Sequence, residues 1–503
     1  MSASTEKKIR QANREAGTDK KIIAAQEEAA KKAKSKRRWV IGTVAVIVFI
    51  VAVLLLDSPL LYTGTTALDV SGTKYSPAEV SYSYANQYYT FTNQYGSYAS
   101  IFGLDTSAGL TGLRSQECNM TDGGTWRDYF LDSAVAELTQ VQALGDYAAA
   151  NGITLTEDEL SEIEQGIANL DQYASVYGYA SADKYLSANY GMGVNSKMAR
   201  ELTRNSTLAN KAYNEKRDSF EYTDAQLDEK YDSYEGSQDV YSYAYCTISV
   251  TDDVTAEQAK AKAEAIVAAY NDSAEDGEED VYARFEAAAQ ASDTAAFRRA
   301  VAASSIVDAL SEWVTGERTE GEAAVLENTT SEGYYAAVFL GRSDNRYNVA
   351  QVRHILVKAV ADENGEYTDE AKAEAKAKAE DILAQWKAGD ATEESFAALA
   401  TELSEDSGSS GNGGLYDSVT KGQMVDEFDK FCFEGHEKGD TAIVYGESSS
   451  YAGYHVMYYV GEGELYSRII ARNDLLTEDM NTWFEELIAP YEAKRSFFIK
   501  LVG

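Results

Sequence analysis

The chain has 503 residues, too many for one ordinary domain, and its 82 acidic residues outnumber its 45 basic ones, so its formal net charge is −37. So acidic a chain repels nucleic acid, and no nucleic-acid-binding function is expected. Three isolated cysteines, Cys118, Cys246 and Cys432, indicate neither a disulfide framework nor a zinc site, although one disulfide stays open as an alternative.

The first 38 residues are basic, and an uncharged apolar run follows them at residues 39–56. Residues 1–38 carry a charge of +7, which leaves −44 on residues 57–503. At about 1.5 Å per residue, the apolar run is just long enough to span a hydrocarbon core as a transmembrane helix. The positive-inside rule then keeps the N-terminus in the cytoplasm and places the bulk of the chain outside the cell membrane. A cleaved signal peptide is the alternative, but no A-x-A-like site follows the run.

Residues 57–238 are predicted to form a helical domain. Capping boxes at Thr156-x-x-Glu159 and Thr223-x-x-Gln226 each mark the start of a helix. An earlier helical stretch is rich in tyrosine, with Tyr82, Tyr84, Tyr88, Tyr89, Tyr95 and Tyr98. These aromatic side chains either offer contact surface to unfolded polypeptides or simply pack between helices.

Residues 239–347 and 348–463 show the same order of predicted strands and helices. The stretch Ala309-Leu-Ser-Glu-Trp-Val-Thr-Gly through Gly333-Tyr-Tyr mirrors Phe428-Asp-Lys-Phe-Cys-Phe-Glu-Gly through Gly453-Tyr-His. We interpret the two segments as copies of one βαααββ fold, with chance similarity between small α/β units as the alternative. The sequence therefore predicts an α+β protein, with an amphipathic helix in residues 464–503.

Two of the three histidines, His354 and His455, lie in the strand-like runs that open and close the second copy. In order, the sequence reads Val352-Arg-His-Ile-Leu-Val-Lys358, Phe396-Ala-Ala-Leu-Ala, Leu403-Ser-Glu-Asp406, Gly413-Gly-Leu415, Lys421-Gly-Gln-Met424, Glu427-Phe428, Lys438-Gly-Asp440 and Gly453-Tyr-His455. This ordered set resembles the parvulin-type peptidyl-prolyl isomerases over the full length of residues 348–463, although no single match is specific.

The resemblance implies that the second copy isomerises X–Pro peptide bonds. Its polar centre would be His354 and His455 on neighbouring strands, with Asp406 at the edge of a loop. The substrate-binding residues, mainly an apolar cup for the proline ring, would be Leu415, Gln423, Met424 and Phe428. Rotation about the imide breaks no bond, so no metal, cofactor or nucleophile is expected.

Each assignment has an alternative. His354 and His455 could be a structural core pair, and Asp406 could cap a turn. Ala452 stands where many relatives carry Ser or Thr, which removes one hydroxyl from the expected hydrogen-bond network and leaves efficient turnover open. The loop at residues 359–370 contains five carboxylates and no basic residue, so phosphorylated substrates should be repelled.

The first copy lacks this equipment. Tyr335 takes the place of His455, and Tyr245 lies near the place of His354, so we expect a catalytically silent domain. SurA-type chaperones likewise pair inactive with active copies. In chaperones of the SurA and PrsA type the C-terminal tail returns to the helical domain, which implies that residues 464–503 pack on the helices of residues 57–238.

The whole chain is similar to PrsA-like foldases, with a transmembrane helix in place of a lipid anchor. That similarity implies an extracytoplasmic foldase whose partners are unfolded or newly secreted polypeptides. A non-catalytic holdase chaperone and an envelope scaffold built from parvulin folds are the alternatives. The oligomeric state stays open.

Overall fold

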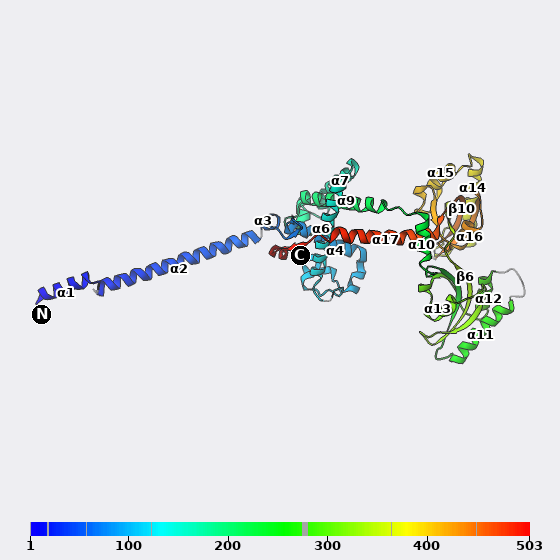
Figure 1. Ribbon diagram of the computed structural model, residues 1–503, viewed down its shortest axis with the longest axis horizontal. Coiled ribbons are helices and arrows are strands. Elements are labelled where there is room, and N and C mark those ends of the chain that lie inside the picture. The colour runs from blue at the N-terminus through cyan, green and yellow to red at the C-terminus, as the bar shows by residue number, and fades with distance from the viewer. Residues whose placement is uncertain are drawn as a thin grey trace. The chain divides into compact units, whose positions relative to one another are not determined.

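The structure is a computed structural model. The residues that it does not describe are 1, 18, 19, 57, 122, 274–279, 364 and 449, and the side chains that it does not describe further include those of residues 20–22, 25, 26 and 51–56. The chain forms two compact units. Residues 1–220 and 480–503 make up the first unit, and residues 221–479 make up the second. Figure 1 labels many of their helices and some of their strands.

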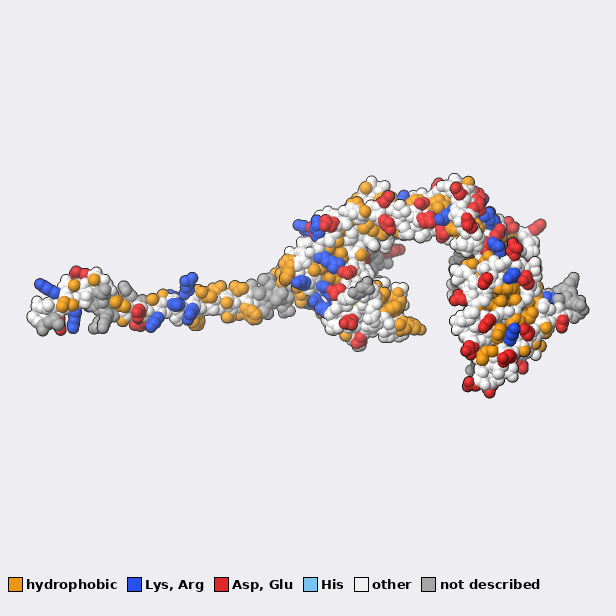
Figure 2. Space-filling model, turned by 60° about the horizontal axis from the view of Figure 1, so that its bottom comes forward, with side chains coloured by type: hydrophobic (Ala, Val, Ile, Leu, Met, Phe, Trp, Pro, Cys, Tyr) orange, Lys and Arg blue, Asp and Glu red, His pale blue; other side chains and the backbone are white. Residues whose placement is uncertain are grey.

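The N-terminal segment forms two helices, α1 (Ala3–Glu15) and α2 (Lys20–Leu56). Along α2, basic side chains give way to exposed apolar ones such as Trp39 and Phe49 (Figure 2). Among the residues that the structure describes, no helix is both long and apolar enough to cross a membrane, so the transmembrane anchor predicted at residues 39–56 is not confirmed. Within that run the structure describes the side chains of residues 39–50. The remaining side chains, those of residues 51–56, lie outside the description.

The first unit holds residues 57–220 of the helical domain predicted at residues 57–238, and residues 221–238 belong to the second unit. The helices of the first unit after α2 are α3 (Pro59–Gly64), α4 (Pro77–Tyr95), α5 (Gly109–Gly112), α6 (Trp126–Asn151), α7 (Glu157–Val176), α8 (Ala182–Tyr190) and α9 (Ser196–Asp218). Capping boxes start α4, α6 and α7, because a Ser or Thr at each start exchanges hydrogen bonds with an acidic residue three positions on.

The tyrosine-rich stretch lies on α4 and mostly fills the core of this unit. Tyr84 and Tyr88 are 1% and 6% exposed and pack edge-to-face against Phe130 of α6. Tyr98, which follows α4, is 68% exposed. Most of these tyrosines therefore pack between helices in the structure, and they do not form a surface for unfolded polypeptides.

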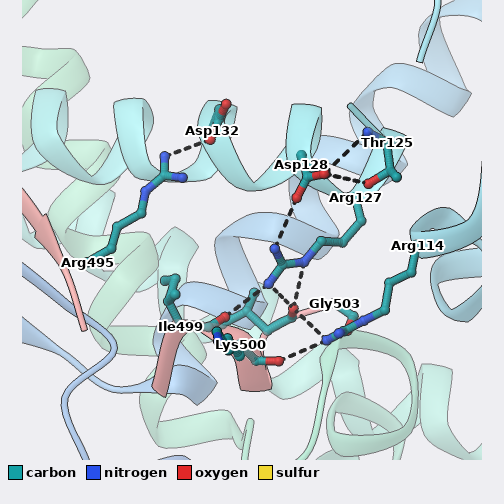
Figure 3. A network of polar contacts seen from close by, with 10 residues as sticks. Arg114, Thr125, Arg127, Asp128, Asp132, Arg495, Ile499, Lys500 and Gly503 are labelled. Carbon is teal, nitrogen blue, oxygen red and sulfur yellow. Dashed lines mark hydrogen bonds and ion pairs between the residues drawn. The ribbon is translucent and has the colours of Figure 1, made fainter. Parts of the chain in front are cut away.

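The C-terminal residues pack against the helices of the first unit. Strand β11 (Ala493–Arg495) pairs antiparallel with β1 (Leu68–Val70), which in turn pairs with β2 (Thr73–Tyr75). Residues 496–503, which follow β11, form a C-terminal tail. Two arginines from earlier in the chain bind main-chain oxygens of this tail (Figure 3). Arg127 donates to Ile499 and Val502 at 3.1 and 2.9 Å, and Arg114 donates to Gly503 at 2.6 Å. Val502 is completely buried, so the tail is part of the core of this unit.

The second unit contains two antiparallel four-stranded sheets with equivalent strand orders, β4-β3-β6-β5 and β8-β7-β10-β9. The first copy consists of β3 (Val240–Ser249), α11 (Ala256–Asp272), α12 (Val281–Gln290), β4 (Phe297–Ala302), α13 (Asp308–Thr315), β5 (Ala323–Glu327) and β6 (Gly333–Ser343). The second consists of β7 (Asn348–Lys358), α14 (Asp369–Ala388), α15 (Glu393–Leu403), β8 (Leu415–Val419), α16 (Asp426–Phe433), β9 (Thr441–Ser448) and β10 (Tyr451–Leu465). Helix α10 (Asp224–Asp232) precedes the two copies and α17 (Tyr466–Ile488) follows them.

Each copy therefore has the order βααβαββ, with one strand more than the sequence predicts. The added strands, β4 and β8, are edge strands of their sheets. Most side chains of β4 are exposed, and β8 has five residues directly after Gly413 and Gly414. Neither strand shows the alternation of buried and exposed residues that marks a strand in a sequence.

Two cores cover the two faces of the second sheet. Ile355 and Val456 lie on the face packed by α14 and α15. Val352 and Met457 lie on the opposite face, which packs against Phe428 and its neighbours on α16. Because successive side chains of a strand point to opposite faces, this division also fixes the face on which each polar residue of β7 and β10 lies.

Candidate active site

His354 and His455 lie on β7 and β10, the two central strands of the second sheet. The antiparallel register pairs His354 with Met457 and Leu356 with His455. Both histidines face α16, where Phe428 packs against the two imidazoles with ring centroids 5.4 and 5.3 Å away. They are 3% and 4% exposed, so both imidazoles are almost completely removed from solvent.

The two imidazoles contact each other and extend into a longer row of hydrogen bonds. Their Nδ1 atoms are 2.9 Å apart, and the rings are stacked with centroids 5.1 Å apart. At one end, Nε2 of His354 lies 3.0 Å from Oδ2 of Asp406. At the other end, the Tyr451 hydroxyl lies 3.0 Å from Nε2 of His455. Tyr451, His455, His354 and Asp406 thus form one continuous row, which we call the imidazole relay.

Asp406 is held by several donors besides His354. The hydroxyls of Ser409 and Tyr416 donate to its Oδ2 at 2.5 and 3.1 Å, and the backbone N–H of Gly408 donates to its Oδ1 at 3.1 Å. The hydrogen bond from His354, followed by the bonds from Ser409 and Gly408, outweighs desolvation and holds the pKa of Asp406 well below its ordinary value. Asp406 is therefore ionised at neutral pH and only accepts hydrogen bonds.

His455, unlike Asp406, is kept uncharged. Burial, together with repulsion from the neighbouring His354, lowers the pKa of His455 to about 3. A neutral imidazole carries one N–H, and the hydrogen bonds decide which nitrogen holds it. If Tyr451 donates to Nε2 of His455, then Nδ1 of His455 carries the proton and donates to Nδ1 of His354, whose Nε2 in turn donates to Asp406.

Glycines allow strand β9 and the turn before β8 to approach the two histidines closely. A Cβ atom at Gly446 on β9 would lie 2.7 Å from Nε2 of His455. Gly414 has φ +71°, and a Cβ there would lie 2.2 Å from the main-chain oxygen of His354. Both the backbone conformation and this clash exclude any larger residue at position 414. The backbone around the relay is therefore as tightly specified as its side chains.

The predicted substrate-binding residues do not all gather at the relay. Phe428 touches both imidazoles, and the half-buried Met424 packs in the same core as Phe428. Gln423 is exposed, and its side chain accepts a hydrogen bond from the backbone of Thr420 within a turn. Phe428 and Met424 thus share the core on the face of the histidines, whereas the side chain of Gln423 is bound within its own turn.

Leu415 lies on the wrong face of the sheet for the role that the sequence predicts. The register of β8 pairs Leu415 with Arg353 and Tyr416 with Val352, and Val352 lies on the face of the histidines. Accordingly, Tyr416 packs against His354 with ring centroids 5.2 Å apart. A shift of one residue moves a side chain to the opposite face, so Tyr416 replaces Leu415 beside His354.

Sequence analysis also missed Ser409 and Tyr451. Ser409 is 2% exposed and lies within a serine- and glycine-rich loop, where nothing in the sequence distinguishes it from its neighbours. Tyr451 could have been found, because it precedes His455 by four residues on one strand and so shares its face. Among the residues that the structure describes, no group of three or more His, Cys, Asp or Glu side chains is arranged to hold a metal ion.

In the first copy, two tyrosines occupy the positions of the two histidines. Tyr335 pairs with Thr247, two residues beyond Tyr245, just as His455 pairs with Leu356, two residues beyond His354. The rings of Tyr245 and Tyr335 meet edge-to-face with centroids 5.6 Å apart. A pair of phenols therefore stands where the second copy has its imidazoles.

Residues 339–459 match a family model described as the PPIC-type PPIase domain. Among solved structures, the peptidylprolyl isomerase PrsA from Bacillus cereus is 26% identical over 29% of this chain and 49% of its own, with a TM-score of 0.19. PrsA from Bacillus subtilis is 16% identical over 74% of this chain and 89% of its own, with a TM-score of 0.27.

A structure described as one of two SurA-like chaperones of Campylobacter jejuni is 14% identical over 70% of this chain and 94% of its own, with a TM-score of 0.18. The chain spans about half the length of the Bacillus cereus protein and 59% of the length of PrsA from Bacillus anthracis. No curated protein sequence matches the chain.

Proposed function

We propose that this chain, which carries a parvulin-type PPIase domain within residues 339–459, catalyses cis–trans isomerisation of X–Pro bonds in unfolded secreted polypeptides. The observation that carries the proposal is the contact between His354 and His455, braced by Asp406 and packed against Phe428, inside the segment that matches the family. A core pair of histidines needs no ionised carboxylate, and this pair has one in Asp406.

The arrangement suits a reaction in which no covalent bond is made or broken. Rotation about the imide costs roughly 18–20 kcal/mol because the bond loses its resonance. A 10⁴-fold acceleration requires only about 5.5 kcal/mol of that barrier. Phe428 and Met424 would hold the proline ring away from water, and the pre-ordered polar groups of the relay would favour the twisted imide over the planar one.

A protease-coupled assay with a prolyl peptide tests the proposal on the whole chain. In the variant His354→Ala/His455→Ala we expect the isomerase rate to fall at least about 100-fold. His436→Ala is the matched control, because His436 stacks on Phe431 and has no contact with the relay among the described residues. Equal activity of the double variant and the wild type would sink the proposal.

We further propose that the chain binds unfolded polypeptides independently of turnover. Exposed aromatic side chains in the helical unit support this role, since Tyr173 and Tyr177 of α7 and its extension are 55% and 65% exposed. The net charge of the chain favours basic segments of a client. A holdase without isomerase activity is the alternative, and the His354→Ala/His455→Ala variant separates the two. Suppression of client aggregation should persist in that variant while isomerisation is lost.

An extracytoplasmic location is proposed as well, with residues 39–56 as the membrane attachment. Its support is the basic segment at residues 1–38 followed by an apolar run, of which the described side chains are exposed. Protease added outside intact cells should then degrade residues 57–503 and spare an N-terminal fragment. Complete protection of the chain in intact cells contradicts this location.

A further inference from the structure

The hydroxyl of Tyr451 is the one member of the imidazole relay that the family resemblance does not account for. Tyr451 is half-buried on β10, and its ring lies 5.8 Å from that of His455 in an edge-to-face arrangement. The oxygen–nitrogen distance of 3.0 Å is that of a full hydrogen bond. Tyr451 and His455 are four residues apart on one strand, so their side chains lie on the same face of the sheet.

Ala452 shows why this hydroxyl comes from residue 451. Ala452 is completely buried, and its main-chain oxygen accepts a hydrogen bond from the N–H of Ala359. It precedes His455 by three residues, so its side chain points to the opposite face of the sheet. A hydroxyl at position 452 of this chain would therefore point away from the face of His455, whereas the phenol of Tyr451 reaches Nε2 directly.

The contact decides where His455 carries its proton. A neutral imidazole has one donor and one acceptor nitrogen, and His455 offers Nδ1 to His354 and Nε2 to Tyr451. When the phenol donates to Nε2, the N–H must be on Nδ1, which then donates to His354. Without the phenol the proton can move to Nε2, and the two Nδ1 atoms then face each other as two acceptors at 2.9 Å.

We propose that Tyr451 is a positioning residue that fixes the tautomer and ring orientation of His455 for X–Pro isomerisation. The inference rests on the proposed isomerase function and assigns to it a residue outside the motif. Tyr451 acts through His455, so its loss should lower kcat and leave KM nearly unchanged.

The test compares Tyr451→Phe with Tyr454→Phe in the full chain. Tyr454 lies on the same strand but on the opposite face, where its ring packs against Tyr445, so this control removes a hydroxyl without touching the relay. In Tyr451→Phe we expect kcat for a prolyl peptide to fall about three- to tenfold. Nitrogen NMR of the histidine side chains should show His455 protonated on Nδ1 in the wild type and partly on Nε2 in Tyr451→Phe. Tyr454→Phe should match the wild type in both measurements.

Each outcome bears on the proposal. An unchanged tautomer in Tyr451→Phe, or an unchanged kcat, overturns it. Thermal unfolding of both variants shows whether a lower kcat reflects loss of folded protein, and an equal loss of stability and kcat in the two variants also overturns it. If the wild type has no isomerase activity, the proposed function fails, while the NMR measurement still decides the assigned tautomer.

Discussion

Nδ1 of His354 and Nδ1 of His455 lie 2.9 Å apart across the two central strands of the sheet, so only one of them can carry a proton. The pair therefore cannot accept two full positive charges without breaking this contact. That single distance links the chemistry of the domain to its stability, because any condition that protonates both rings must separate them.

Acidic pH should destabilise the second copy. The pKa of His455 is lowered to about 3 in the folded protein, below its ordinary value of 6.5, by burial and by His354. Its contribution to stability is therefore complete above pH 6.5 and is lost as the pH falls from 6.5 towards 3. Asp406, whose pKa is also lowered by its hydrogen bond from His354, adds a further loss at more acidic pH.

Amide hydrogen exchange of β7 and β10 at a series of pH values measures this loss after correction for the intrinsic rate. Between pH 7 and pH 4 the opening free energy should fall by a few kcal/mol in the wild type and much less in His455→Gln. His436→Gln should behave as the wild type. A pH profile of the wild type as flat as that of His455→Gln contradicts the prediction.

Gly446→Ala should impair the relay more than it impairs the fold. The new methyl group would lie 2.7 Å from Nε2 of His455 and 2.9 Å from Cγ2 of Val425, so the imidazole has to shift. We expect isomerase activity to fall at least about tenfold, because a displacement of this size disturbs a catalytic arrangement strongly. Gly411→Ala is the control, since a Cβ there has no heavy atom within 4 Å. Equal activities of the two variants count against the prediction.

Phosphorylated peptides should be poor substrates. The loop at residues 359–370 has five carboxylates and no cation, so a phosphoserine before proline meets like charge. We expect kcat/KM for a phosphoserine–proline peptide to be about tenfold lower than for its unmodified form at low salt, and the gap to narrow at high salt. A preference for the phosphorylated peptide is the contrary result.

The first copy should contribute no isomerase activity. Tyr245 and Tyr335 stand at the register positions of His354 and His455, so the first copy has two phenols in place of the imidazole pair. In the full chain carrying His354→Ala/His455→Ala, the remaining rate should equal the uncatalysed rate measured without protein. A residual rate that is further reduced by Tyr245→Phe would assign activity to the first copy.

Arg127→Ala should loosen the C-terminal tail from the helical unit. Its guanidinium group donates to the main-chain oxygens of Ile499 and Val502. These oxygens keep their bonds from the N–H of Val502 and from Arg114, so the loss removes only the charged hydrogen bonds, at a cost of about 1–3 kcal/mol. Limited proteolysis should then cleave residues 496–503 faster than in the wild type. Arg204→Ala, a change at an exposed arginine of α9, should leave the cleavage rate unchanged.

The sequence predicts the relay's two histidines because ordered motifs identify a whole domain. The spacing from His354 to His455 fits one strand at each end of a repeat, and the structure brings the two rings together. Asp406 is found by the same order of motifs. What the order of motifs cannot give is the register of a short edge strand, which is why Leu415 is predicted in place of Tyr416.

Contacts between elements are the other part that sequence reasoning misses. Ser409 reaches His354 only through the conformation of its loop, and that conformation depends on tertiary hydrogen bonds to Asp406. The sequence position of Ala452 alone predicts that a hydroxyl is missing beside His455. The direction of each side chain on β10 decides instead that Tyr451 supplies one.

The grip of Arg114 and Arg127 on the tail has a consequence for how this segment evolves. Both guanidinium groups donate to main-chain oxygens, which every amino acid provides. These contacts therefore depend on the path of the backbone and not on the side chains of the tail. Substitution of Lys500 by other residues should therefore have little effect on how the tail binds the two arginines. An insertion or deletion of one residue between β11 and Val502 would instead move the main-chain oxygens away from the arginine side chains that bind them.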